Sequence, residues 1–171
     1  MRIDPLGAYN FTIALVDSSG TPLGAVKTLV GAAVGGFSEC SGLETTLETE
    51  DFREGGNNGK ALKFPTRVTW SSIRLRRGMA LSDDLWLWHR SFVEGKGKRR
   101  DGIIALQNDL RIPIRIWIFR RGLPVKWTGP SLDAAQSRVA IEELDIGHEG
   151  LELVSAGTAI AAGVEAVAGL L

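Results

Sequence analysis

Apolar and polar residues alternate with a period of two along several segments, which predicts a chain built mainly from β-strands. Residues 9–16 alternate before the turn sequence Asp17-Ser18-Ser19-Gly20, as a strand followed by a turn does. Residues 45–52 place Thr and Leu on one face and Glu mainly on the other, so we expect one packed and one solvated face. Further strands are predicted at 67–75, 112–119 and 139–146.

Two of these strands carry more specific expectations. An isoleucine stripe on 112–118 is opposed by a face containing Trp117 and Phe119, which is too large to be left in water. We therefore expect this second face to meet another element. In 139–146 the apolar phase slips at Glu142-Glu143, and a β-bulge there is our hypothesis.

One segment has helical spacing. Leu85, Trp88 and Phe92 recur at intervals of three and four, and Ser82 is the expected N-cap, with two aspartates after it. These features predict a short helix that packs on the strands.

Composition narrows the function classes. Twenty basic residues balance twenty acidic ones, so no net field recruits nucleic acid or an anionic membrane. Cys40 is the single cysteine, which excludes an intrachain disulfide and gives no sign of oxidising export. The first residues contain no apolar run typical of a signal peptide. The pattern is that of an ordinary globular protein with one main domain, expected at 1–154.

The segment 155–171 is unusual because Glu165 is its only charge. One interpretation is a membrane-seeking tail. The other, which we favour, is an Ala-rich helix with a narrow packing seam, because three glycines and the central glutamate weaken membrane insertion. The seam consists of Ile160, Val164, Val167 and Leu171.

No catalytic, cofactor-binding or metal-binding set emerges. The run Gly55–Lys60 departs from a phosphate-binding loop, because Glu54 stands where the first glycine belongs and Ala61 replaces the Ser or Thr. His89 and His148 have no partners at metal-ligand spacing. A dispersed Ser/His/Asp triad stays open, although no G-x-S-x-G motif supports it. We therefore predict a protein that is not an enzyme and has no cofactor.

A basic turn at 96–100 has two interpretations. It could contact a phosphate backbone, or it could be a solvated hairpin that pairs with acidic strands such as 44–50 in the same or a neighbouring copy. Zero net charge and a single tyrosine favour the second interpretation. Five tryptophans in a chain of 171 residues also indicate that some anchor an interface.

Several sequence blocks occur in a fixed order. They are GFSECSGLE at 36–44, REGGNN at 53–58, LRRGM at 75–79, LWLWH at 85–89, KGKRRDGIIAL at 96–106, PVKWTGPSLDA at 124–134 and VAIEELDIGHEGLEL at 139–153. Together they resemble the tail-tube family of contractile phages and related extracellular injection particles, itself related to type VI secretion tube proteins. The resemblance covers residues 4–154 and leaves the tail outside it.

The resemblance implies a compact antiparallel β-sandwich or barrel with one flanking helix. It also implies six-fold rings with a continuous inner β-barrel, stacked into a hollow tube inside a contractile sheath. In the family, the long loop after the acidic strand reaches the adjacent ring. Here that ring-stacking loop comprises Arg53, Glu54, Gly55, Gly56, Asn57, Asn58, Gly59 and Lys60.

The residues suggest further surfaces for such an assembly. The candidate lumen face is Glu44, Thr46, Glu48 and Glu50. The candidate interface residues are Lys98, Arg99, Arg100, Trp117, Trp127 and His148. Expected partners are other copies of the chain, the sheath protein, baseplate and spike hub proteins, and cargo or DNA in the lumen, with no membrane insertion of the core.

We therefore expect a structural tube subunit, made in the bacterial cytoplasm and built into a phage tail or injection particle. The alternative within this class is a tube-initiator ring that joins the spike hub to the tube. From another class, a nucleic-acid-binding module using residues 96–100 stays open, and salt-dependent binding would identify it.

Overall fold

The computed structural model describes residues 7–17, 36–53, 55, 59–79 and 82–155. These contain strands β1 (Phe11–Asp17), β2 (Phe37–Ser41), β3 (Thr45–Phe52), β4 (Leu62–Trp70), β5 (Ile73–Gly78), β6 (Arg100–Gln107), β7 (Pro113–Thr128), β8 (Ile141–Gly147) and β9 (Leu151–Ser155), and the helix α2 (Asp84–Val93). The mainly β chain with one flanking helix confirms the predicted fold class.

Two antiparallel sheets share the long strand β7. Its first half lies between β6 and β9 in the order β1-β6-β7-β9, which we call sheet A. Its second half pairs with β8 in the order β7-β8-β5-β2, which we call sheet B. The transition lies at Arg121, which has a φ of 51° and donates its backbone N–H to Asp101 Oδ1 at 2.8 Å. The sheets do not close into a barrel within the described residues.

The main core lies between the two sheets and α2. Its largest fully buried side chains include Ile13 and Phe119 from sheet A and Leu75 and Leu144 from sheet B. Phe119 is 0% exposed, which confirms that the second face of the isoleucine strand meets another element. On the opposite side of sheet A, a second apolar cluster comprises Ile103, Ala105, Ile116 and Ile118.

The hypothesis of a β-bulge at Glu142-Glu143 is wrong. β8 pairs with β5 without interruption, and the irregularity on its other side lies in β7, between Pro124 and Lys126. Glu142 is 3% exposed and occupies a core position where an apolar residue would be expected. The apparent slip in phase therefore reflects a buried carboxylate.

The helix is confirmed, with Leu85 and Trp88 buried on one side. Its N-cap is Asp83 rather than Ser82, and the Asp83 side chain makes no capping hydrogen bond. The Ser82 hydroxyl instead accepts the backbone N–H of Asp84 at 3.4 Å. Ser82 therefore contributes to the helix start from one position further out.

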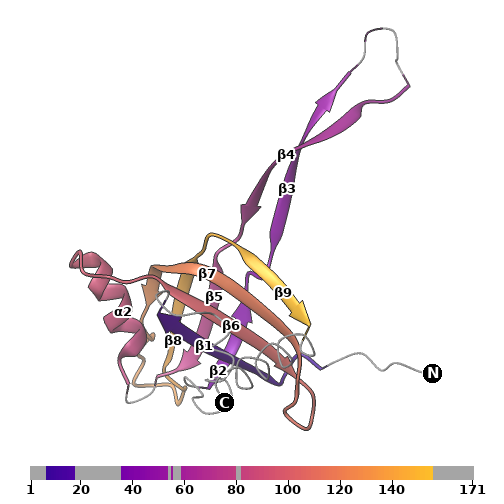
Figure 1. The fold of residues 1–171 in the computed structure, drawn as a ribbon. Coiled ribbons are helices and arrows are strands. Elements are labelled where there is room, and N and C mark those ends of the chain that lie inside the picture. The colour runs from indigo at the N-terminus through magenta and orange to yellow at the C-terminus, as the bar shows by residue number, and fades with distance from the viewer. Residues whose placement is uncertain (1–6, 18–35, 54, 56–58, 80–81, 156–171) are drawn as a thin grey trace, which may run out of the picture.

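β3 and β4 form a separate two-stranded hairpin that projects from the sheets (Figure 1). All residues of β3 are exposed, so the expected packed face of residues 45–52 is absent within the subunit. The predicted strand at 67–75 is divided at Ser71 and Ser72 into the end of β4 and the start of β5. The chain thus leaves the sandwich after β2 and returns to it at β5.

Candidate assembly surfaces

The projecting hairpin, β3 with β4, exposes apolar side chains on both of its faces. Leu47 and Val68 lie opposite one another and are 56% and 50% exposed. On the other face Phe52 and Phe64 form an edge-to-face pair with ring centroids 6.1 Å apart, and both remain about half exposed. Large apolar groups on a projecting element are characteristic of an interaction surface.

Ion pairs brace the same hairpin across its two strands. Arg67 Nε lies 2.9 Å from Glu48 Oε2, and Lys63 Nζ lies 2.8 Å from Asp51 Oδ1. These pairs are exposed and contribute little to stability. Three of the candidate lumen residues, Thr46, Glu48 and Glu50, lie on β3 of this hairpin, and Glu44 directly precedes the strand.

The predicted ring-stacking loop lies in sequence between β3 and β4. Arg53, Gly55, Gly59 and Lys60 are exposed, while Glu54, Gly56, Asn57 and Asn58 lie outside the described residues. In Figure 1 the end of β3 and the start of β4, which flank these residues, lie away from the two sheets.

The root of the hairpin is tightly built, and the sequence did not reveal it. Gly42 has a φ of +85°, and a Cβ there would lie 2.1 Å from the carbonyl oxygen of Ser72. The Ser71 hydroxyl donates to Glu44 Oε2 at 3.2 Å. Only glycine fits this crossing of the outgoing and returning chain, because both the backbone conformation and the close approach exclude a side chain.

His148 joins this root to the turn between β8 and β9. Its Nε2 lies 3.0 Å from the carbonyl oxygen of Ser71, and its Nδ1 lies 3.0 Å from that of Gly150. The ring also contacts Trp70 and Phe119, with centroids 5.9 and 6.0 Å away. The structure thus places this candidate interface residue within the subunit, where it anchors the hairpin.

The outward face of sheet B carries a charge ladder, which we define as Glu39, Arg74, Arg76, Glu143 and Asp145. Arg76 lies 2.8 Å from Glu39 and 2.9 Å from Glu143, so it links β2 to β8 across β5.

The second rung of the charge ladder pairs Arg74 Nε with Asp145 Oδ1 at 2.7 Å. The hydrogen bond from Arg74 lowers the pKa of Asp145 below its usual value, against a smaller opposing effect of desolvation. The two rungs together make a polar surface whose charges are already paired.

Beneath sheet B, a buried ion pair connects β5 to β8. Arg77 Nε donates to Glu142 Oε1 at 2.6 Å, and the two side chains are only 3% and 4% exposed. Trp127 Nε1 donates to the other oxygen of Glu142 at 2.9 Å, and Arg77 also donates to the carbonyl oxygen of Ser82 at 3.1 Å. Trp127, a candidate interface residue, therefore satisfies a buried carboxylate.

The basic turn joins α2 to β6. Arg99 lies 3.0 Å from Glu149, which also binds Arg121 at 2.8 Å. Arg100 stacks over the ring of Trp88, with its guanidinium carbon 5.0 Å from the ring centroid. The carbonyl oxygen of Lys98 accepts the indole N–H of Trp88 at 2.9 Å. These contacts fix the turn against the helix and the β8–β9 turn.

The described residues contain neither a candidate metal site nor a candidate membrane-spanning helix. Among them, no group of three or more metal-binding side chains gathers at one place. None of their helices has the length and apolar character needed to cross a membrane.

The paired sheets, flanking helix and projecting hairpin define the class of fold found in contractile injection particles. A protein in the six-fold symmetrised baseplate of the anti-feeding prophage matches with a TM-score of 0.77 and 24% identity, over 91% of this chain and 99% of that one. A protein in the extended sheath–tube complex of the extracellular contractile injection system PVC matches with a TM-score of 0.72 and 23% identity, over 88% and 92%.

The chain belongs to the T4-like virus tail tube protein gp19 family, whose model matches residues 8–152. This membership confirms the resemblance drawn from the ordered sequence blocks. A comparison with curated proteins finds no match.

Proposed function

We propose that this chain is a subunit of the inner tube of a phage tail or contractile injection system, and that it forms stacked hexameric rings around a lumen. Its membership of the tail tube family supports this role. The observation that carries the proposal is the projecting hairpin, which exposes Leu47 and Phe64 on opposite faces and, beyond the contact of Trp70 with His148 at its root, is exposed all along β3. Such an element gains stability only when another copy covers it.

Ring closure uses the open edges of sheet B. In the described part of the chain, β2 and the second half of β7 each pair on one side only. Unpaired edges invite strand addition, and pairing between neighbouring subunits removes them. Four strands from each subunit then contribute to a continuous inner barrel.

The charge ladder on sheet B forms the lumen wall in this arrangement. Its arginines and carboxylates are paired with one another, so they offer few free charges to hold a passing cargo. The other face of sheet A carries Ile103 and Ile116, which are 1% exposed and therefore lie within the subunit. The paired charges support our proposal that sheet B lines the lumen, instead of the glutamate face of the hairpin.

Cysteine accessibility distinguishes these two lumen assignments. Thr128 is exposed on β7 opposite Glu143, and Thr46 lies on the glutamate face of the hairpin. In a Cys40→Ser background, we expect Thr128→Cys in assembled tubes to react with a small maleimide and not with a large polymer-linked one. Thr46→Cys provides the matched comparison. If the size selection appears at Thr46 instead, the glutamate face lines the lumen.

Ring stacking is tested by the aromatic pair on the hairpin. Burying one such side chain contributes roughly 1.5–3 kcal/mol, and six copies multiply the effect at each ring junction. We expect the double variant Phe52→Ser and Phe64→Ser to form rings or monomers but no tubes in negative-stain microscopy. Lys63→Gln, an exposed change on the same hairpin, should leave tubes intact. Normal tubes from the double variant would contradict the proposal.

The role we propose is structural rather than enzymatic, in keeping with a family of tail tube proteins. The chain is then made in the bacterial cytoplasm and assembled with sheath, baseplate and spike hub proteins, with cargo or DNA passing through the lumen. The solved structures that share its fold come from a baseplate and from a sheath–tube complex, which fits this set of partners.

A tube-initiator ring is the second candidate. It is favoured by the match to a baseplate protein, which covers 99% of that protein with a TM-score of 0.77. The purified chain distinguishes the two roles, because a tube subunit polymerises into long tubes, whereas an initiator stops after one or two rings.

A further inference from the structure

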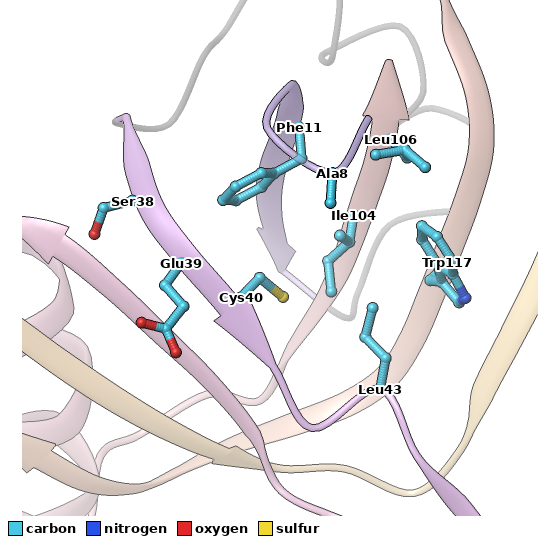
Figure 2. Close-up of a pocket in the computed structure, with 9 residues that line it drawn as sticks. All are labelled: Ala8, Phe11, Ser38, Glu39, Cys40, Leu43, Ile104, Leu106 and Trp117. Atoms are coloured by element: carbon cyan, nitrogen blue, oxygen red, sulfur yellow. The ribbon is translucent and has the colours of Figure 1, made fainter. Parts of the chain in front are cut away.

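An apolar pocket of about 290 Å³ lies between the two ends of the strand path, where β2 faces β1 and β6 (Figure 2). Its main lining residues are Phe11, Cys40, Leu43, Ile104, Leu106 and Trp117. In the described part of the chain, β1 and β2 each pair on one side only, so the sandwich is open here. The apolar lining and modest volume suit one or two large apolar side chains better than a polar cofactor.

At the opposite edge of sheet B, α2 carries a row of side chains that we call the helix stripe, namely Trp86, His89 and Val93. Their spacing of three and four residues places them on one side of the helix. Trp86 contacts Trp127 of the edge strand β7, with ring centroids 4.7 Å apart, so the stripe lies beside this edge. Trp86 and Val93 are 37% and 75% exposed, which leaves the stripe uncovered in the single subunit.

The pocket and the helix stripe lie on the same face of sheet B. Cys40 lines the pocket and Trp127 contacts the stripe, and both pack against the main core. The two residues also end one row of paired positions, which runs from Cys40 through Leu75 and Leu144 to Trp127. Each subunit therefore presents a pocket at one end of this row and the helix stripe at the other.

Pairing between the edges of two copies brings these surfaces together. Three antiparallel pairings separate β7 from β2, so the two edge strands run in opposite directions. Copies related by rotation around a ring keep these directions, and β2 of one copy meets β7 of the next as an antiparallel neighbour. The core face of sheet B stays on one side of the joined sheet, so α2 of the next copy lies beside the pocket.

We propose that α2 of a neighbouring copy docks its helix stripe on the pocket between β1 and β2 and so closes the open side of the sandwich. This inference rests on the ring closure proposed above and names the side chains that complete it. The helix then packs on two subunits, with Leu85 and Trp88 in its own core and the stripe on the next copy. Trp86 and Val93 leave water only when the ring closes, which favours the ring over the single subunit.

Cross-linking in assembled tubes tests this contact, because Cys40 is the single native cysteine and lines the pocket. We expect a short bis-maleimide to join Val93→Cys of one copy to Cys40 of the next and to give covalent multimers up to the hexamer on denaturing gels. The introduced thiol is exposed and reacts first, after which the second maleimide reaches only thiols nearby. Leu87→Cys is the matched control, since it is also exposed and lies about 120° from Val93 around the helix.

The expected result is cross-linking at least about tenfold faster for Val93→Cys than for Leu87→Cys, because only the first thiol is held near Cys40. Equal rates in tubes that microscopy shows to be intact would overturn the docking and leave the tube proposal standing. A link to Cys40 of the same chain, found by peptide mass without multimers, would overturn it as well. If the parent chain forms neither rings nor tubes, the proposed function fails and the docking fails with it.

Two measurements avoid the introduced thiol. Maleimide labelling of Cys40 in the parent chain should be much slower in tubes than in unassembled subunits, and equal rates would contradict a cover supplied by a second copy. Val93→Asp places a charge in the docked stripe, so we expect the subunit concentration needed for ring formation to rise at least about tenfold. Leu87→Asp adds the same charge off the stripe and should leave this concentration within about twofold. The same concentration for both variants would also contradict the docking.

Discussion

Replacing Arg77 by methionine tests the buried ion pair between β5 and β8. Arg77 and Glu142 are almost fully buried, with 2.6 Å between Arg77 Nε and Glu142 Oε1. The substitution keeps much of the apolar bulk but leaves the Glu142 carboxylate in the core without its cationic partner, while the indole N–H of Trp127 still donates to it. The carbonyl oxygen of Ser82 loses its donor as well.

The expected loss of stability in Arg77→Met follows from the free-energy cost of an unpaired buried charge. Removing one partner of a buried pair typically costs about 3–5 kcal/mol. For a chain of this length each kcal/mol lowers the melting temperature by about 2–4 °C, so the midpoint should fall by roughly 6–20 °C. We expect the double variant Arg77→Met and Glu142→Met to recover part of this loss. Recovery is incomplete because the Trp127 N–H then lacks an acceptor.

Urea unfolding of unassembled subunits, followed by circular dichroism, gives the free energies for this comparison. Arg77→Lys serves as a control that keeps the charge but not the forked geometry, and it should fall between the parent and Arg77→Met. A loss below about 1 kcal/mol for Arg77→Met would refute the reasoning. So would a double variant less stable than Arg77→Met alone, because the isolated carboxylate would then not be the source of the cost.

Three further predictions concern other positions. Gly42→Ala should destabilise the chain by more than about 2 kcal/mol in urea unfolding, because its positive φ and the Ser72 carbonyl leave no room for a Cβ, while Gly36→Ala meets no atom within 4 Å and should be neutral. The rate of Cys40 alkylation should have its pH midpoint near 11 instead of 9.0, because burial and then the Glu39 charge raise the pKa of the thiol. The stability linked to the protonated thiol is lost as the pH rises through this pKa of the folded protein. Arg74 lowers the pKa of Asp145, so the contribution of this carboxylate to stability is present above pH 3.8 and is lost as the pH falls through its lower pKa in the folded protein. Arg74→Ala should reduce this acid sensitivity, measured by urea unfolding at a series of pH values. A midpoint near 9.0, or an unchanged acid profile, would contradict the corresponding cause.

Local patterns in the sequence were enough to predict most of the strands and the helix. The alternation around Ile116 and the spacing of Leu85 and Trp88 report burial directly, because each side chain's environment follows from its own position in the element. The ordered blocks also identified the family, and with it the fold class.

Partners that are distant in sequence could not be predicted in the same way. Glu142 looked like a break in the strand because its partner Arg77 lies 65 residues away. The residues of β3 were expected to pack on one face because an alternating pattern indicates two different faces. The pattern does not indicate whether the apolar face is covered by the same chain or by another. The root of the hairpin depends on Gly42 meeting Ser72, a contact that no local pattern contains. Of the predicted helix at 155–171, Ser155 is the last residue of β9 and the rest lies outside the described residues.

The exposed hairpin has a consequence for the kinetics of polymerisation. A two-stranded ribbon is only marginally stable in water, so much of its ordering free energy must come from the surface on which it docks. In the tube that we propose, a pair of colliding subunits offers little of that surface, whereas a completed ring offers all of it. Growth at an existing end is then favoured over spontaneous nucleation, with a lag phase that preformed seeds abolish. A cell could therefore hold a large pool of unassembled subunits and still decide where each filament begins.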